Sequence, residues 1–475
     1  MAKKILMIWM ILSTLAMTMR FVTGVSSHDR ESTNMPGEDN QLFLPLILKN
    51  HPMLSIFGMD GSTKFDRIAE TGTSWVRLNT ALLWSEVQPD GPTSFNWDNT
   101  NVQRIEYEIL EAKSKGLAVL LIVRSTPTWA MKYPQTGKKC GPIARSYFDE
   151  FASFMREVVV RYSQPPYEVM HYAIWNEPDS PLADTPGDWP LGCWGDPAES
   201  YFGGIYYGEL LKELYPIVKG VNQNVQIVTG SFLMYCDPRW SGTGACPPNT
   251  YIPWANFFEG VLIGSQGLFD VVGYNGHVSY AAGKNPVWSE RNNWRWSRAG
   301  GLVDGKVNYL QDKMSNRLGY QKPIMLTEGG LVDGSDGDPV FEEAKSDYLV
   351  YGYANTWAIG LQANIWYTFT GWKGSALISG NQARPAFYAM KTMTQILKDA
   401  KFINREVFTE YEKFIYHRGS QEIWLLIPTG EVAGTSYNVS KPDNFVKLVD
   451  IYGNEQPDPG SIISFSRPVY VFRTR

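Results

Sequence analysis

The stretch "VMHYAIWNEP", residues 169 to 178, predicts the architecture of the chain. Its first seven residues are mostly apolar, as in a strand of a parallel sheet that is covered on both faces. The run then stops at an amide, a carboxylate and a proline, which are Asn176, Glu177 and Pro178. A buried strand that ends directly in polar residues indicates a functional site at its carboxyl end.

Similar runs recur along the chain and alternate with helical patterns. They begin near residues 54, 75, 117, 169, 225, 269, 323 and 363. Segments 101–116 and 147–162 carry apolar residues at helical spacing, and a long loop is expected before the run near residue 269. Eight strand–helix units predict an α/β fold, a (β/α)8 TIM barrel. The competing interpretation is an open doubly wound sheet, but the sequence has no GxGxxG or Walker motif.

Both ends of the chain differ from this pattern. Two lysines precede an apolar run and then smaller residues, which predicts a secretory signal peptide, or a membrane anchor if the segment is not cleaved. The C-terminal part carries short alternating strands, which predict a small antiparallel, sandwich-like β domain. The expected organisation is a signal peptide at 1–26, a linker with an isolated strand at 27–50, a catalytic barrel at 51–398 and the β domain at 399–475.

The composition favours a globular protein that does not bind nucleic acid. The 475 residues are 44% hydrophobic, and the formal net charge of −5 offers no basic surface for a phosphate backbone. The chain has 17 tryptophans and 26 tyrosines. Such rings often serve the core, but they also stack on sugars, so they weakly favour a carbohydrate ligand.

The four cysteines form an even set, which favours disulfides in an exported chain. Cys236 and Cys246 bracket a short loop rich in glycine and proline, so we expect them to pair. That pairing leaves Cys140 and Cys193 for a second bridge. A zinc site is the alternative, but the sequence has no CxxC and no clustered histidines. We therefore expect no metal and no cofactor.

The chemistry is expected at two glutamates. Glu177 ends the fourth strand and Glu328, in "PIMLTEGG", ends the seventh, so both side chains reach the same mouth of the barrel. Two carboxylates about 5–5.5 Å apart suit the retaining hydrolysis of a glycosidic bond. Trp175 and Pro178 give Glu177 the apolar surroundings of a general acid. Arg77, at the end of the second strand, is expected to keep Glu328 ionised as the nucleophile.

These motifs resemble a known superfamily. "WNEPD" and "LTEGG" are similar to the signature of clan A glycoside hydrolases, the retaining four-seven barrels, and the C-terminal strands resemble the β domain of family 39. The resemblance implies that Glu177 is the acid/base, that Asn176 bonds the sugar 2-hydroxyl and that Glu328 is the nucleophile. An arginine at the end of the second strand is also common in that clan, and Arg77 resembles it. The third strand lacks the histidine of family 5 cellulases, and its Trp129 is more similar to family 39.

Further sugar-binding residues are expected at the ends of other strands. His277 and Tyr280 follow the sixth strand and resemble a histidine–tyrosine pair that is common in the clan. Trp366 and Trp372 come from the eighth, and one of them is expected to form the floor under the sugar. A role in the core stays open for His277 and for both tryptophans.

The predicted function is a secreted retaining glycoside hydrolase that acts on an oligo- or polysaccharide. Two alternatives remain. One is a catalytically silent carbohydrate-binding protein on the same barrel, and the other is a structural protein associated with the cell surface. The oligomeric state is not predicted.

Overall fold

The computed structural model describes residues 54–183, 192–246 and 256–475. The predicted signal peptide at 1–26 and the linker and strand at 27–50 lie outside the described residues. Residues 50–475 belong to one compact unit.

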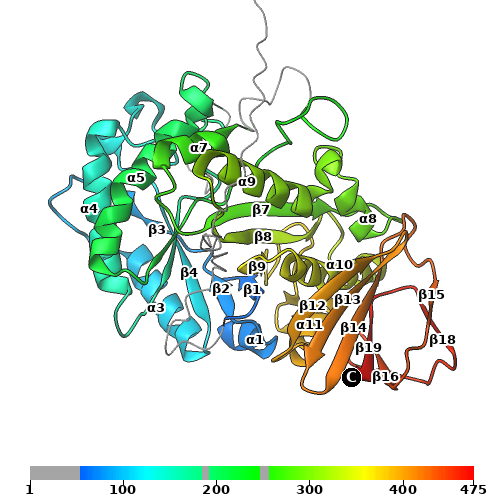
Figure 1. Cartoon of the computed structure of the whole chain (residues 1–475). Helices are drawn as coiled ribbons and strands as arrows, with labels where there is room; N and C mark the ends of the chain where they lie inside the picture. Colours follow the sequence, from blue (N-terminus) through cyan, green and yellow to red (C-terminus); the bar gives the residue numbers. More distant parts are fainter. Residues whose placement is uncertain (1–53, 184–191, 247–255) are drawn as a thin grey trace, which may run out of the picture. The chain divides into compact units, whose positions relative to one another are not determined.

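A parallel sheet forms the centre of this unit (Figure 1). Its strands run in the order β6-β5-β4-β2-β1-β9-β8-β7, and the short β3 (Leu82–Leu83) pairs with β4. The bounds are β1 (Phe57–Asp60), β2 (Trp75–Arg77), β4 (Ala118–Arg124), β5 (His171–Ile174), β6 (Gln226–Val228), β7 (Val272–Ser279), β8 (Ile324–Val332) and β9 (Ala363–Trp366). Isolated parallel bridges, Val228–Val271 and Phe232–Tyr274, join the two edge strands. The sheet therefore curls round on itself, consistent with the predicted (β/α)8 barrel.

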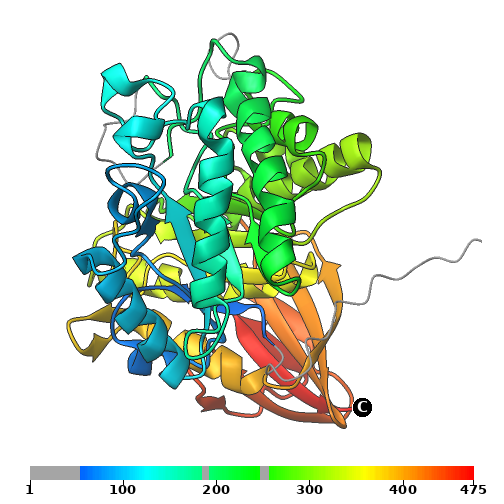
Figure 2. The same ribbon diagram turned by 90° about the vertical axis from the view of Figure 1, so that its left-hand side faces the viewer.

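Helices cover the outer face of the curled sheet (Figure 1). In Figure 2, long helices coloured cyan to green stand side by side in front of the strands. Their bounds are α1 (Phe65–Glu70), α2 (Trp84–Val87), α3 (Thr100–Ser114), α4 (Phe148–Tyr162), α5 (Gly204–Val221), α7 (Phe257–Ser265), α8 (Pro286–Arg291), α9 (Leu302–Leu318), α10 (Pro339–Ala358) and α11 (Pro385–Ile396). The helical patterns at 101–116 and 147–162 correspond to α3 and α4.

The core has an inner and an outer layer, because successive side chains of a strand point to opposite faces. On β4, Leu120 and Ile122 belong to a compact cluster of residues drawn from most of the strands, which fills the interior of the curled sheet. Val119, Leu121 and Val123 belong to the larger cluster between the strands and the helices. This alternation shows which residues at the strand ends face the mouth of the sheet.

Helix α7 stands where the sequence predicted only a long loop. The helix contains two glycines, Gly260 and Gly264, which lower helix propensity. A Cβ at Gly264 would lie 2.2 Å from the Ile205 carbonyl oxygen of α5, and one at Gly208 would lie 2.6 Å from the Val261 carbonyl oxygen. The glycines let two helix backbones meet, so packing stabilises a helix that local propensity does not favour.

Residues 401–474 form antiparallel sheets that fit the predicted β domain (Figure 1, orange to red). The main sheet has the order β12-β13-β14-β19-β16-β17, and β15 pairs with β18. The bounds are β12 (Lys401–Val407), β13 (Tyr411–Arg418), β14 (Gln421–Pro428), β15 (Tyr437–Ser440), β16 (Phe445–Asp450), β17 (Glu455–Gln456), β18 (Ile462–Phe465) and β19 (Val469–Thr474), and a small hairpin of β10 (Ile378–Ser379) and β11 (Gln382–Ala383) precedes them. Ion pairs such as Arg467–Asp347, at 2.8 Å, join these strands to α10.

Both expected disulfides are present. Cys236 pairs with Cys246 and Cys140 pairs with Cys193, with Cα–Cα distances of 4.9 Å and 5.3 Å. Two disulfides are consistent with an extracellular protein. Within the described ranges, no helix is long and apolar enough to cross a membrane.

Candidate active site

The chain leaves β5 through residues with left-handed backbone conformations. Trp175 has φ of 68° and Glu177 has φ of 51°, values that non-glycine residues rarely adopt and that cluster at functional sites. The Trp175 ring packs at 5.1 Å from that of Trp194, and its Nε1–H donates to the Cys140 carbonyl oxygen at 3.0 Å. Because Cys140 is bonded to Cys193, the disulfide helps to fix the Cys140 carbonyl group that Trp175 contacts.

Glu177 is buried at the mouth of the sheet, with 5% of its surface exposed. Its Oε1 accepts a hydrogen bond from the Asn275 side-chain amide at 2.7 Å. Burial and the nearby charge of Glu328 raise the pKa of Glu177 well above its ordinary value, although the Asn275 bond acts in the opposite direction. Glu177 therefore favours its protonated form.

Glu328 lies on β8 in a different electrostatic environment. Its Oε1 accepts from Arg77 Nη2 at 2.6 Å, and its Oε2 lies 3.4 Å from His277 Nε2. Burial acts to raise the pKa of Glu328, but the Arg77 guanidinium and the His277 ring outweigh it, and the pKa falls below its ordinary value. Glu177 therefore favours its acid form, whereas Glu328 favours its anion.

Arg77 connects several of the polar groups. In addition to Glu328, its guanidinium donates to Asp60 Oδ2 at 2.7 Å and to Asn176 Oδ1 at 2.9 Å. Arg77 and Asp60 are almost fully buried. Burial raises the pKa of Asp60 to about 7, although Arg77 opposes the shift. The predicted link between Arg77 and Glu328 is therefore present, and Asn176 is fixed beside it.

Asn275 was not predicted from the sequence, yet it lies between the two glutamates. In the ladder between β7 and β8, Asn275 is the direct partner of Glu328, so their side chains share a face. The Asn275 amide also helps to lower the pKa of Glu328. Thr327 Oγ1 lies 3.1 Å from Asn275 Oδ1, which orients the amide nitrogen toward Glu177.

A buried lysine fixes the backbone beneath Asn275. Lys306, on α9, donates to the carbonyl oxygens of Asn275 and Leu233, both at 2.6 Å. Burial lowers the pKa of Lys306 to about 7, while the carboxyl groups of Asp179 and Glu177 act to raise it. The ammonium group thus connects β7 to the end of β6 and holds Asn275 in place.

A cluster of aromatic side chains lies beside Glu328. The His277 ring is 5.2 Å from that of Trp372 and 5.6 Å from that of Tyr367. Trp372 is 40% exposed, so part of its face is free for a ligand. Tyr367 was not predicted; burial raises its pKa, and the charges of Asp60 and Glu328 add to the shift. Of the two predicted tryptophans, Trp372 is the one that reaches this group.

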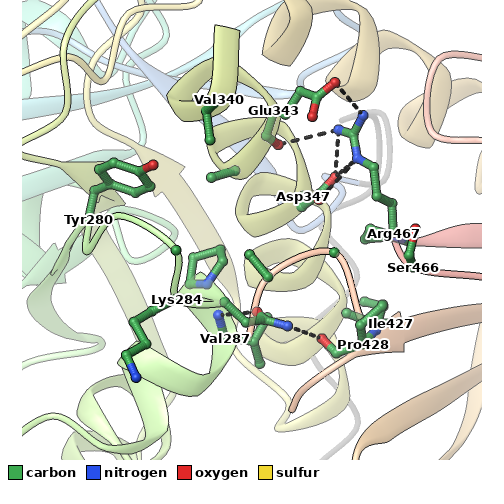
Figure 3. A pocket seen from close by; sticks show the side chains of 17 residues that line it. Tyr280, Lys284, Val287, Val340, Glu343, Asp347, Ile427, Pro428, Ser466 and Arg467 are labelled. Carbon is green, nitrogen blue, oxygen red and sulfur yellow. Dashed lines mark hydrogen bonds and ion pairs between the residues drawn. The ribbon is translucent and has the colours of Figure 1, made fainter. Parts of the chain in front are cut away.

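Three of the predicted sugar-binding residues have other partners. The Trp366 indole is buried against α10 and donates to the Ser375 carbonyl oxygen at 2.9 Å. Trp129 Nε1–H donates to the Gln88 carbonyl oxygen at 2.9 Å. Tyr280 contacts Phe341 and lines a pocket of about 120 Å³ that the β domain helps to form (Figure 3). A role in sugar binding stays a prediction for all three.

The pocket at Tyr280 is lined largely by framework residues. Figure 3 shows Arg467 in its ion pair with Asp347. The Asn285 side-chain amide donates to the Pro428 carbonyl oxygen at 3.0 Å. Across residues 54–183, 192–246 and 256–475, no group of His, Cys, Asp and Glu side chains could hold a metal ion.

Comparison with known proteins supports the predicted resemblance. A family model described as cellulase (glycosyl hydrolase family 5) matches residues 49–233. No curated protein matches the chain in sequence. The region matched by the family model thus includes the "WNEP" motif at the end of β5, although β4 lacks the histidine typical of family 5.

Solved structures of glycoside hydrolases share the fold. A family 39 glycoside hydrolase from the gut symbiont Bacteroides cellulosilyticus WH2 is 17% identical, with a TM-score of 0.63 over 90% of this chain and 83% of that one. A family 30 subfamily 8 xylanase from Clostridium acetobutylicum is 12% identical, with a TM-score of 0.57 over 90% and 97%. A family 39 enzyme from Xanthomonas axonopodis pv. citri is 12% identical, with a TM-score of 0.52 over 89% and 94%. The predicted resemblance to clan A, near family 39, is confirmed.

Proposed function

We propose that the chain is a secreted retaining glycoside hydrolase that cleaves O-glycosidic bonds by double displacement. Glu328 is the nucleophile and Glu177 is the general acid and base. The observation that carries this proposal is the opposite shift of the two pKa values, well above the ordinary value for Glu177 and below it for Glu328. Two carboxyl groups with separated pKa values are what acid-assisted glycosyl transfer requires.

In the first step, the Glu328 carboxylate attacks the anomeric carbon while Glu177 protonates the leaving oxygen. The bond from the sugar to that oxygen breaks, and an ester to Glu328 forms. Arg77 keeps Glu328 ionised and holds its Oε1, so that Oε2, which has only the longer 3.4 Å contact with His277, is the oxygen for attack. Asn176, fixed by Arg77, is positioned to bond the sugar 2-hydroxyl.

In the second step, water attacks the anomeric carbon, the bond from the sugar to Glu328 breaks, and Glu328 leaves as a carboxylate. Glu328 carries no charge while it is esterified, so its contribution to raising the pKa of Glu177 disappears. Glu177 then loses its proton more readily, which suits a base that deprotonates the attacking water. The Asn275 amide bonds the resulting carboxylate.

The remaining assignments extend this proposal to the whole chain. Trp372 is the aromatic platform for an oligo- or polysaccharide, and no metal or cofactor takes part. The organisation is a signal peptide at 1–26, a linker at 27–50, a (β/α)8 catalytic barrel at 51–398 and a β domain at 399–475. Secretion is supported by the two disulfides, which persist in oxidising compartments.

The stereochemistry of hydrolysis tests the proposal. The first product of an active aryl glycoside or polysaccharide, followed by proton NMR before mutarotation, should keep the anomeric configuration of the substrate. Inversion would exclude a nucleophilic role for Glu328. Binding of glycans without turnover on a broad panel would favour the catalytically silent protein instead.

The pH profile gives a second test, because activity needs ionised Glu328 and protonated Glu177. We expect a bell-shaped kcat/KM, with an acid limb below the ordinary glutamate pKa of 4.5 and an alkaline limb well above it. Asn275 lowers the pKa of both groups, so Asn275→Ala should move both limbs to higher pH. Asn308→Ala, at an exposed position on α9, is the matched control. Unmoved limbs in Asn275→Ala would contradict its place between the glutamates.

A further inference from the structure

Arg124 is a cation that the proposed mechanism does not use. It is the last residue of β4 and follows Leu120 and Ile122 at intervals of two, so it shares their inner face. It lies at the carboxyl end of the strand, the end that also carries Arg77 on β2 and Glu177 after β5. Strands β2 and β5 flank β4 in the sheet, and the short β3 pairs with its carboxyl end. The Arg124 side chain is therefore aimed at the same mouth as the glutamates.

Arg124 has no ionic partner in the described part of the chain. No hydrogen bond or ion pair of its guanidinium is present there, whereas the Arg77 guanidinium contacts three side-chain oxygens. Burial lowers the pKa of Arg124 to about 10; the charge of Glu86 acts to raise the pKa, and the charge of Arg77 acts to lower it further. Arg124 stays protonated at neutral pH, with donors that carry no protein acceptor.

No acidic side chain contacts Arg124 in the described part of the chain, and Glu86 attracts it only from beyond ion-pair distance. The charges of Arg77 and Glu328 offset each other in their ion pair. Burial and the charge of Glu328 raise the pKa of Glu177, which favours its neutral form. A half-buried guanidinium without a hydrogen-bonding partner is costly, and its planar fork of donors matches a carboxylate or a sulfate.

The backbone at Arg124 is fixed, as a binding residue requires. Arg124 pairs with Leu83 of β3, and the next residue, Ser125, has φ of 80°. The Ser125 hydroxyl lies 2.7 Å from that of Ser85, and Thr126 donates to the Gly141 carbonyl oxygen at 2.7 Å. Contacts on both sides of the turn thus fix the backbone from which the Arg124 side chain extends.

We propose that Arg124 binds an anionic group of the substrate, a carboxylate or a sulfate ester on a sugar unit, and that the preferred substrate is an acidic glycan. This inference rests on the proposed hydrolase function and adds a substrate class to it. A neutral glycan would leave the guanidinium without a contacting anion, whereas an acidic unit would form a bidentate pair with it.

Matched polymers test the role of Arg124. Glucuronoxylan is compared with its carboxyl-reduced form and carrageenan with its desulfated form, which keep the linkages but lose the charge. For the wild-type enzyme, kcat/KM is expected to be about 10- to 100-fold higher on at least one native polymer than on its neutral form, the range of one charge-assisted pair. Loss of the preference on carboxyl reduction identifies a carboxylate, and loss on desulfation identifies a sulfate.

Three variants complete the test. Arg124→Gln should bring the ratio of native to neutral kcat/KM close to one, and Arg124→Lys, which keeps the charge without the fork, should give an intermediate ratio. Arg156→Gln removes an exposed cation on α4 and should leave the ratio unchanged. An unchanged ratio in Arg124→Gln, or a wild-type preference for the neutral polymers, overturns the inference alone. If neither acidic nor neutral glycans are hydrolysed, the proposed function fails as well.

Discussion

Replacement of Glu328 by glycine is expected to lower kcat/KM by at least about 10⁴-fold on every active substrate, whatever the leaving group. The variant cannot form the covalent intermediate, and Arg77, which holds Glu328 at 2.6 Å, has no chemical role that replaces it. Initial rates on aryl glycosides and on a polysaccharide would measure the loss. Full activity in this variant would rule out Glu328 as the nucleophile.

Chemical rescue makes this prediction specific. Sodium azide can occupy the space left by the Glu328 side chain and attack the anomeric carbon of a substrate with a good leaving group. The glycosyl azide should then have the configuration opposite to that of the substrate, because only one displacement occurs. A product of unchanged configuration would contradict the assignment.

A buried glutamate outside the site provides the matched control. Glu290, on α8, is fully buried, and its Oε1 accepts from the Val303 backbone amide at 2.7 Å. Burial raises the pKa of Glu290 to about 8, so it is mostly protonated at pH 7 and Glu290→Gln is nearly isosteric. Activity in Glu290→Gln should stay within about 3-fold of wild type.

The strand ends and the residues that follow them were predictable because their signals are local. An apolar run that stops at a polar residue needs only a few neighbouring positions, which is how Arg77, Glu177 and Glu328 were found. The strands near 169 and 323 are present as β5 and β8. The identity of the partner that each carboxyl group contacts depends on strand register, and register across the sheet is not a local property.

Side-chain parity could have found more of the site. On β9, Ala363 and Ile365 belong to the interior cluster, so Tyr367 continues the inner face and Trp366 points outward. The same alternation from Val271 leads inward to Asn275 and His277. These assignments need the inner face of each strand, which a continuous apolar run does not reveal. In a strand that is buried on both faces, the sequence alone does not distinguish the inner face from the outer face.

The missed helix and the contacts of the β domain have a different cause. Helix α7 depends on glycines that fit against α5, and glycine by itself argues against a helix. The Arg467–Asp347 pair joins residues 120 positions apart. Both features arise from tertiary packing, which local propensity does not record.

Replacement of Glu177 by alanine is expected to act differently on the two chemical steps. For substrates with poor leaving groups, such as natural glycans, kcat/KM should fall about 10²- to 10⁴-fold because the leaving oxygen is no longer protonated. A dinitrophenyl glycoside needs no proton on its leaving group, so its first step should remain fast. Hydrolysis of the ester then lacks its base and becomes rate-limiting, so the intermediate accumulates and both kcat and KM fall.

Azide separates the roles of the two glutamates. In Glu177→Ala, azide should attack the ester on Glu328 without needing a base, restore turnover of the dinitrophenyl glycoside and yield a glycosyl azide of unchanged configuration, because two displacements occur. The alkaline limb of the pH profile, which reflects the raised pKa of Glu177, should also disappear. An equal loss on good and poor leaving groups, or an azide of inverted configuration, would mean that Glu177 is not the proton donor. If azide gives inversion in the Glu328 variant and retention in the Glu177 variant, as expected, the two results together identify which carboxyl group attacks the sugar and which one transfers the proton.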